Sequence, residues 1–187
     1  MHRDRGASER QMRDRPVSDR EGATRCPGCG ARVADSDGPT HPYLGAAPGC
    51  WALYGEVLAR EYGELRYPEI HRLTVDAYAA QHPGVPSRRS IQSLAVHLVS
   101  LHLVLDRGID PVHATGAIRR LLARRPCLAW LDPPPRLGAT TVADLLGAGT
   151  AAEHERRVRS WAIDVWAAWA PHHAAVRGWA DLACEER

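Results

Sequence analysis

The feature that most constrains the fold of this chain is the sequence Cys26-Pro-Gly-Cys29-Gly, which lies in a segment unable to form a core of its own. Residues 26–50 are rich in Gly, Pro and Cys and have neither helical nor strand periodicity. A segment this short generally needs a cross-link to remain ordered. Two cysteines separated by two residues and followed by Gly form a tight turn that directs both sulfurs at one ion. The motif therefore predicts a zinc knuckle.

A closed structural zinc site requires four ligands. The next donors along the chain are His41 and Cys50, which complete the pattern C-x2-C-x11-H-x8-C. We predict a zinc ion held by Cys26, Cys29, His41 and Cys50, with His71 as the alternative fourth ligand. The other interpretation is a redox-active or free thiol pair. A redox pair is expected in a strand–turn–helix context, which this Gly-rich loop does not provide.

The rest of the chain has the periodicity and the start and stop signals of helices. Apolar residues recur at three- and four-residue spacing, and Ser, Thr or Asp precedes several of the periodic segments. The expected helical segments are 51–62, 68–82, 87–107, 110–124 and 150–169, with a last helix after Pro171. No convincing strand is expected. The predicted fold class is mostly α, a bundle of five to seven helices with an N-terminal zinc-knuckle loop.

The predicted organisation has three parts: a disordered Arg-rich arm over 1–25, a zinc-knuckle segment over 26–50 and a helical bundle domain over 51–187. The 24 basic residues are all Arg, so lysine chemistry is excluded. They nearly balance the 22 acidic residues, which argues against nucleic acid as the partner. No apolar run reaches the roughly 18 residues of a membrane span, and the first residues lack a secretory apolar region. We expect a cytoplasmic protein without membrane contact, whose cysteines are reduced.

Ten histidines are many for a chain of 187 residues. If the segments 68–82 and 87–107 form an antiparallel pair, His71 and His97 meet across it, and Asp76 or Glu61 could join them. His154 and His172 are five helical turns apart and share a face if their helix is continuous. His71, His97, His154 and His172 are therefore candidates for a second metal site between helices. The alternatives are buried histidines satisfied by neighbouring groups, or acid–base catalysis without a metal.

Four longer motifs stand out in the chain. They are Cys-Pro-Gly-Cys-Gly from Cys26, Gly-Cys-Trp-Ala-Leu-Tyr-Gly-Glu-Val-Leu-Ala-Arg-Glu-Tyr from Gly49, His-Arg-Leu-Thr-Val-Asp-Ala-Tyr-Ala-Ala-Gln-His-Pro-Gly from His71 and Ser-Ile-Gln-Ser-Leu-Ala-Val-His from Ser90. In these motifs the chain resembles a bacterial family of uncharacterised proteins, a domain of unknown function. The resemblance covers roughly residues 25–180. It implies no particular activity.

These observations predict a zinc-binding helical protein, with the zinc stapling a binding or scaffold module whose partner is an unknown protein or small molecule. One alternative is a metal-dependent hydrolase or lyase, with the histidine-rich site between helices holding an ion that activates water. A second is a nucleic-acid-binding zinc protein that uses the Arg-rich arm. The number of metal sites discriminates between the first two hypotheses, because only the enzyme requires a second, open site.

Overall fold

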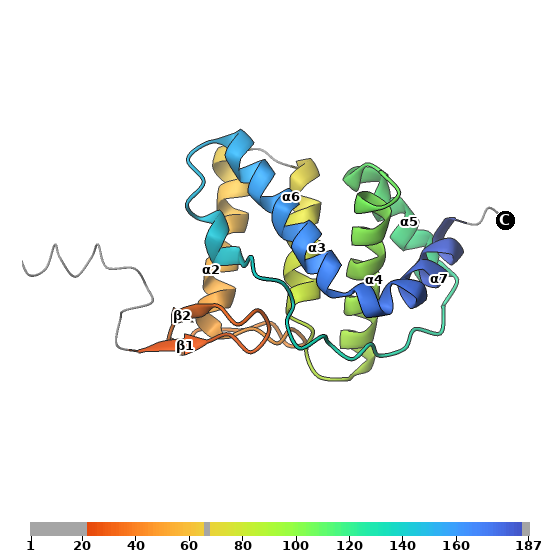
Figure 1. Cartoon of the computed structure of the whole chain (residues 1–187), viewed down its shortest axis with the longest axis horizontal. Coiled ribbons are helices and arrows are strands. Elements are labelled where there is room, and N and C mark those ends of the chain that lie inside the picture. The colour runs from red at the N-terminus through yellow and green to blue at the C-terminus, as the bar shows by residue number, and fades with distance from the viewer. Residues whose placement is uncertain (1–21, 66–67, 185–187) are drawn as a thin grey trace, which may run out of the picture.

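The computed structural model describes residues 22–65 and 68–184, and in these residues the predicted mostly α fold is confirmed (Figure 1). The described residues contain six α-helices: α2 (Pro48–Arg60), α3 (Pro68–Gln81), α4 (Arg88–Leu105), α5 (Pro111–Ala123), α6 (Ala151–Ala168) and α7 (His173–Cys184). A π-helical turn, Glu61–Leu65, extends α2. Most of the predicted N-terminal arm, residues 1–21, lies outside the described residues.

The helix boundaries follow the capping signals of the sequence. The Ser87 hydroxyl accepts a hydrogen bond from the backbone N–H of Ser90 and starts α4. Asp110 caps α5 in the same way through the N–H of Val112, with proline at the first helical position. Pro171 separates α6 from α7, and the chain crosses the break in a short 3-10 turn, Ala170–His172.

The expectation that the chain contains no strand was wrong, because a small antiparallel hairpin precedes the bundle. Strand β1 (Ala23–Arg25) pairs with β2 (Arg32–Ala34), and the Cys-Pro-Gly-Cys-Gly turn connects them. Three-residue strands are too short to show a two-residue periodicity in the sequence. The hairpin is anchored by packing: Val33 is fully buried, and a Cβ atom at Gly49 of α2 would lie 2.2 Å from the Ala34 carbonyl oxygen.

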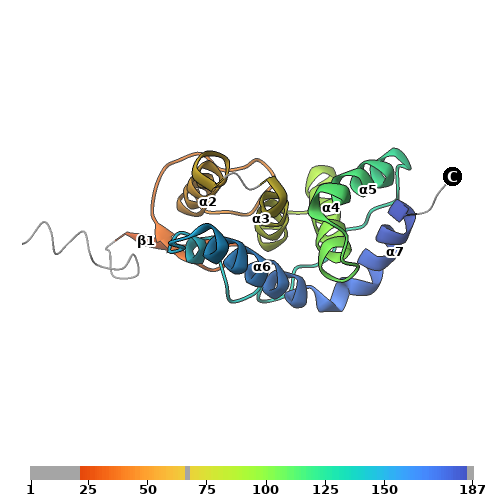
Figure 2. The same cartoon turned by 90° about the horizontal axis from the view of Figure 1, so that it is seen from above.

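Helix α3 occupies the centre of the molecule and packs against both α4 and α6. Figure 2 shows α2, α3 and α6 grouped beside the hairpin, with α4, α5 and α7 on the other side. Two fully buried tryptophans of this core donate their indole N–H groups to the end of α3. Trp161 donates to the Gln81 side-chain oxygen and Trp169 to the Ala80 carbonyl, each at 3.0 Å. The C-terminal end of α3 is therefore fixed both by packing and by hydrogen bonds.

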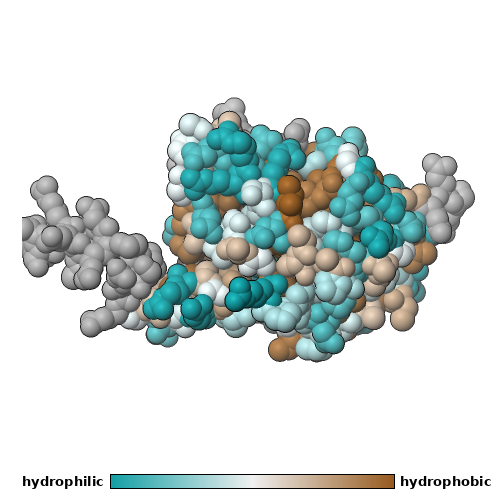
Figure 3. Space-filling view, viewed as in Figure 1, coloured by the Kyte–Doolittle hydropathy of each residue, from teal (hydrophilic) through white to brown (hydrophobic). Residues whose placement is uncertain are grey.

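The surface drawn in Figure 3 is mostly hydrophilic, with a small hydrophobic area in its upper middle. This agrees with a core that collects the large apolar side chains between the helices. Within the part of the chain that the structure describes, no helix has the length and apolar character needed to cross a bilayer.

Candidate metal centre

Four side chains from three separate parts of the chain converge where the hairpin meets the bundle. They are Cys26, Cys29, Cys50 and His82, and their sulfur and nitrogen donor atoms all lie within 4.8 Å of one another. Cys26, Cys50 and His82 are buried, and Cys29 is partly exposed. The arrangement offers three sulfurs and one imidazole, which is a ligand set of structural metal sites in proteins.

The first two sulfurs are positioned by the backbone of the hairpin turn. The backbone N–H of Cys26 donates to the Ala31 carbonyl, and that of Gly30 donates to the Cys26 carbonyl, both at 2.9 Å. Gly30 has a φ of +76°, in the left-handed region that glycine adopts without strain. Gly28 is required for a different reason: a Cβ atom there would lie 2.6 Å from the His82 ring and 2.7 Å from the Gly45 carbonyl oxygen. The turn therefore packs directly on His82.

The third sulfur belongs to Cys50, in the first turn of α2. Its Sγ lies 3.8 Å from the Cys29 Sγ and 3.3 Å from the Nε2 atom of His82. The Tyr78 hydroxyl donates to the Cys50 sulfur at 3.7 Å, and the Ala47 backbone N–H donates to the Cys26 sulfur at 3.4 Å. Such N–H and O–H donors around the sulfurs stabilise thiolates and hold them in orientation.

His82 follows the last residue of α3 and is completely buried. Its Nδ1 donates to the Tyr78 carbonyl at 2.7 Å, one helical turn earlier, which leaves Nε2 facing the sulfurs. Histidine ligands usually bind the metal through one ring nitrogen and donate the N–H of the other to a carbonyl or carboxylate. Burial alone would lower the pKa of His82, but the neighbouring Cys26 and Cys29 sulfurs outweigh it and raise the pKa to about 9. Hydrogen bonds from Cys29 and Cys50 lower the pKa of the Cys26 thiol, so the cluster favours a thiolate.

The structure places His82, and not His41, beside the three sulfurs. His41 packs its ring edge-on against Tyr43, with centroids 4.2 Å apart, and lies 5.2 Å from the Trp51 ring. Its Nδ1 is buried and has no hydrogen-bond partner among the described residues. Burial, together with the nearby charge of His97, lowers the pKa of His41. The loop after the knuckle turns His41 onto these aromatic rings, so the end of α3 supplies the nitrogen instead.

His71, the alternative fourth ligand, lies in a different cluster around the buried carboxylate of Glu61. The His71 Nδ1 is 2.8 Å from one Glu61 oxygen, and the His154 Nε2 is 2.9 Å from the other. The Thr74 hydroxyl also donates to Glu61, at 2.5 Å. Burial alone would raise the pKa of Glu61, but the hydrogen bonds from His154, His71 and Thr74 outweigh it and lower the pKa.

The four histidines that we proposed as a second metal site are therefore distributed over three locations. His97 contacts Asp76, with Nδ1 2.7 Å from the carboxylate, instead of His71. In the register that α3 and α4 adopt, His97 faces Asp76, which lies five positions after His71. His172 reaches the Asp132 carbonyl from the break between α6 and α7. Among the described residues, the cysteine cluster with His82 is the one group of three or more such side chains whose donor atoms come this close together.

Local spacing in the sequence could not have identified His82. It lies 32 residues beyond Cys50, and only the packing of α3 against the hairpin brings it to the sulfurs. One weak signal is present, since His82 comes directly before Pro-Gly at the end of a helix, a position where a side chain can face a neighbouring loop.

Residues 24–170 match the model of a family of unknown function, DUF5946. The chain belongs to DUF5946. No curated protein and no solved structure matches it. The matched range begins within the hairpin and ends just after α6, so all four residues of the cluster lie inside the DUF5946 region.

Proposed function

We propose that this protein is a zinc-stapled helical binding module, with a structural zinc ion held by Cys26, Cys29, Cys50 and His82. The observation that carries the proposal is the convergence of four donor atoms within 4.8 Å, at the junction of hairpin, α2 and α3. Thiolate donors select zinc, copper(I) or iron–sulfur clusters over magnesium and calcium. A mixed set of three sulfurs and one imidazole within 4.8 Å of one another favours zinc among these, because zinc takes such sets in closed four-ligand sites.

A structural role is favoured over a catalytic one by the number and burial of the donors. Catalytic zinc keeps one position open for water or substrate, whereas four protein ligands fill a tetrahedral ion. Cys26 and Cys50 are 2% and 0% exposed, and His82 is 0% exposed, which leaves little access for a substrate.

The proposed staple would secure the segment between the hairpin and α2 to the end of α3. The backbone N–H of Gly45 donates to the His82 carbonyl at 3.0 Å, and Leu44 forms an isolated β-bridge with Pro83. These backbone contacts flank the ligand His82. Zinc binding would therefore contribute directly to the folding free energy of this half of the molecule, as in other small structural zinc sites.

For the binding partner we propose a small molecule or a protein, with the module in the reducing cytoplasm. The net charge of +2 over 187 residues is far from the strongly basic surface that nucleic-acid binding needs. Reduced cysteines are required for metal binding, and a reducing compartment maintains them.

The test is the zinc content of the purified full chain by native mass spectrometry, with thermal unfolding of the same samples. The variants are Cys26→Ser and, as a matched control, Cys127→Ser, which changes an exposed cysteine outside the cluster. We expect one zinc per chain in the wild type and in Cys127→Ser. Cys26→Ser should lose the zinc and unfold at a much lower temperature. A Cys26→Ser protein that retains zinc, or that melts like the wild type, contradicts the proposal.

A further inference from the structure

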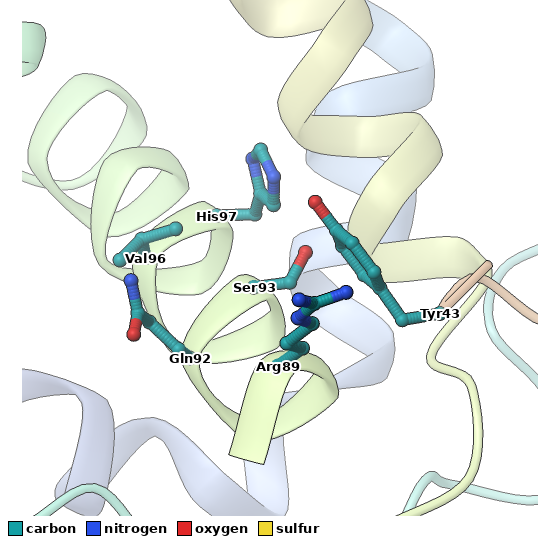
Figure 4. Close-up of a pocket in the computed structure, with 6 residues that line it drawn as sticks. All are labelled: Tyr43, Arg89, Gln92, Ser93, Val96 and His97. Atoms are coloured by element: carbon teal, nitrogen blue, oxygen red, sulfur yellow. The ribbon is translucent and has the colours of Figure 1, made fainter. Parts of the chain in front are cut away.

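A pocket of about 490 Å³ lies on the N-terminal half of α4, and none of the four metal-ligand candidates lines it (Figure 4). Its volume is in the range of sites that hold small organic molecules. The lining residues are Tyr43, Arg89, Gln92, Ser93, Val96 and His97. Neither the proposed zinc staple nor the family match assigns a role to this pocket.

One helix face supplies five of the six lining side chains. Arg89, Ser93 and His97 follow one another at four-residue spacing, so they project from the same side of α4. Figure 4 shows Tyr43 reaching towards this face from the loop before α2, with its hydroxyl group turned to the side of His97. The polar groups therefore converge on one space from two separate elements.

His97 is oriented from beneath by a buried carboxylate. Asp76 is 0% exposed and accepts a hydrogen bond from the His97 Nδ1 at 2.7 Å. The other Asp76 oxygen accepts from the Ser100 hydroxyl at 2.5 Å and from the Arg72 Nε at 3.0 Å. This network commits Nδ1 and fixes the ring, leaving Nε2 for a ligand. Nε2 is an acceptor in the neutral ring and a second donor in the imidazolium.

Arg89 gives the pocket its charge preference. Its guanidinium is exposed and forms no hydrogen bond or ion pair with any residue in the described ranges. None of the lining residues is acidic. An unpaired guanidinium in a pocket favours a carboxylate or phosphate group, to which it can donate two parallel hydrogen bonds. The half-buried Tyr43 ring and Val96 side chain offer apolar contact to the remainder of a ligand.

We propose that this pocket binds a small organic anion, with Arg89 holding its carboxylate or phosphate group and the Nε2 atom of His97 hydrogen-bonding it. The apolar part of the ligand lies against Tyr43 and Val96. The site belongs to the same binding module as the proposed zinc staple and gives that module a class of ligand.

The inference depends on the proposed zinc site in one respect: the zinc site helps to fix the loop that carries Tyr43. Leu44 is bridged to Pro83, next to His82, and a Cβ atom at Gly84 would lie 2.5 Å from the Tyr43 carbonyl oxygen. The loop that carries Tyr43 is thus tied to the residues that follow the proposed ligand His82. Removing the metal should disturb the pocket, whereas changing Arg89 should leave the metal bound.

The experiment is a titration of the metal-loaded full chain, followed by the imidazole resonances of its histidines in ¹H–¹³C NMR spectra. The probes are phenyl phosphate and benzoate, which share an apolar ring and differ in the anionic group. A His97→Gln sample assigns the His97 resonance. The test variant is Arg89→Gln. The matched control is Arg88→Gln, which removes the same charge from the preceding residue, outside the pocket.

We expect a saturable shift of the His97 resonance with at least one probe, and the stronger binder identifies the preferred anionic group. Arg89→Gln should weaken the affinity about tenfold, as expected when a charged hydrogen bond is lost, and Arg88→Gln should leave it unchanged. Absence of saturation with both probes, or equal weakening by both variants, overturns the inference. The zinc content of the same samples distinguishes a failure of this inference from a failure of the proposed zinc site. If the chain contains zinc but binds neither probe, the anion site is wrong and the zinc site stands.

Discussion

Helix α3 connects two histidine clusters that differ in how their polar groups are satisfied. At its C-terminal end, His82 directs a nitrogen at three sulfurs, and together these four groups could hold a metal ion. Towards its N-terminal end, His71 and His154 both hydrogen-bond the Glu61 carboxylate, which is a partner from within the protein. A buried histidine therefore does not by itself indicate a metal. The groups that face it decide whether it binds an ion or completes a hydrogen-bonded pair.

The two clusters also differ in what holds them together in the absence of an ion. Glu61 is 1% exposed and takes part in hydrogen bonds with the side chains of His71, Thr74 and His154, so groups of the protein itself satisfy its carboxylate. In the sulfur cluster, a thiolate raises the pKa of His82 to about 9, although burial of the imidazole acts in the opposite direction. Metal binding displaces such protons and replaces them with one ion.

The largest expected effect tests which histidine completes the sulfur cluster. His82→Ala should lose the zinc and more than about 4 kcal/mol of unfolding free energy, because a structural metal is lost with its ligand. His41→Ala should retain the zinc, since its ring contacts Tyr43 and Trp51 instead of the sulfurs. Metal analysis and urea unfolding of both variants provide the measurement. Zinc loss in His41→Ala with zinc retained in His82→Ala would reverse the assignment.

The next effect concerns the carboxylate cluster. Glu61→Gln should destabilise the protein by about 3 kcal/mol, because it removes the buried charge that contacts the buried His154 and the partly exposed His71. Its zinc content should not change. Glu155→Gln is the control, since Glu155 is 46% exposed and pairs with Arg159 one turn away. Urea unfolding at neutral pH measures both. If both variants lose the same unfolding free energy, the buried Glu61 cluster contributes no more to stability than an exposed ion pair.

The pH dependence of stability sharpens the same comparison. The pKa of Glu61 is lowered by folding, so its contribution is complete above the unfolded value of about 4.3 and is lost as the pH falls through the folded value. The stability gap between the wild type and Glu61→Gln should therefore narrow in acid, below about pH 4.3. The unfolding free energy of both proteins is measured after zinc removal, because acid would also release zinc and change the stability independently of Glu61. A gap that stays constant into acid would contradict the charge-based explanation.

The smallest effects compare two glycines. Gly28→Ala should cost about 1–3 kcal/mol and weaken zinc binding, because the added methyl group meets the His82 ring and two backbone oxygens at less than 3.0 Å. Gly55→Ala in α2 should instead stabilise the protein by about 0.5–1 kcal/mol, since nothing lies within 4 Å of the added atom and alanine favours the helix. Thermal unfolding and zinc competition with a chelator measure both. If Gly28→Ala and Gly55→Ala change stability and zinc affinity alike, the knuckle turn does not pack directly on the His82 ring.

The sequence by itself determined the helical elements and much of their boundaries. Caps such as Ser87, Asp110 and Thr150 act on backbone groups two or three residues away, so their effect can be inferred without the fold. The Cys-Pro-Gly-Cys-Gly turn is equally local, and it indicated that a metal site would lie near the N-terminal segment. The hairpin strands escaped prediction because three residues carry no readable period.

Only the tertiary structure decided which partners these local elements meet. His82 joins the sulfurs because the end of α3 packs on the knuckle, and His97 meets Asp76 because α3 and α4 pack in a register that no local signal specifies. The pocket on α4 likewise depends on Tyr43, which comes from a loop far away in sequence. The physical reason is the sequence distance over which each interaction acts. Caps and turns are set by hydrogen bonds within a few residues, whereas long-range contacts depend on how the apolar faces of separate helices fit together.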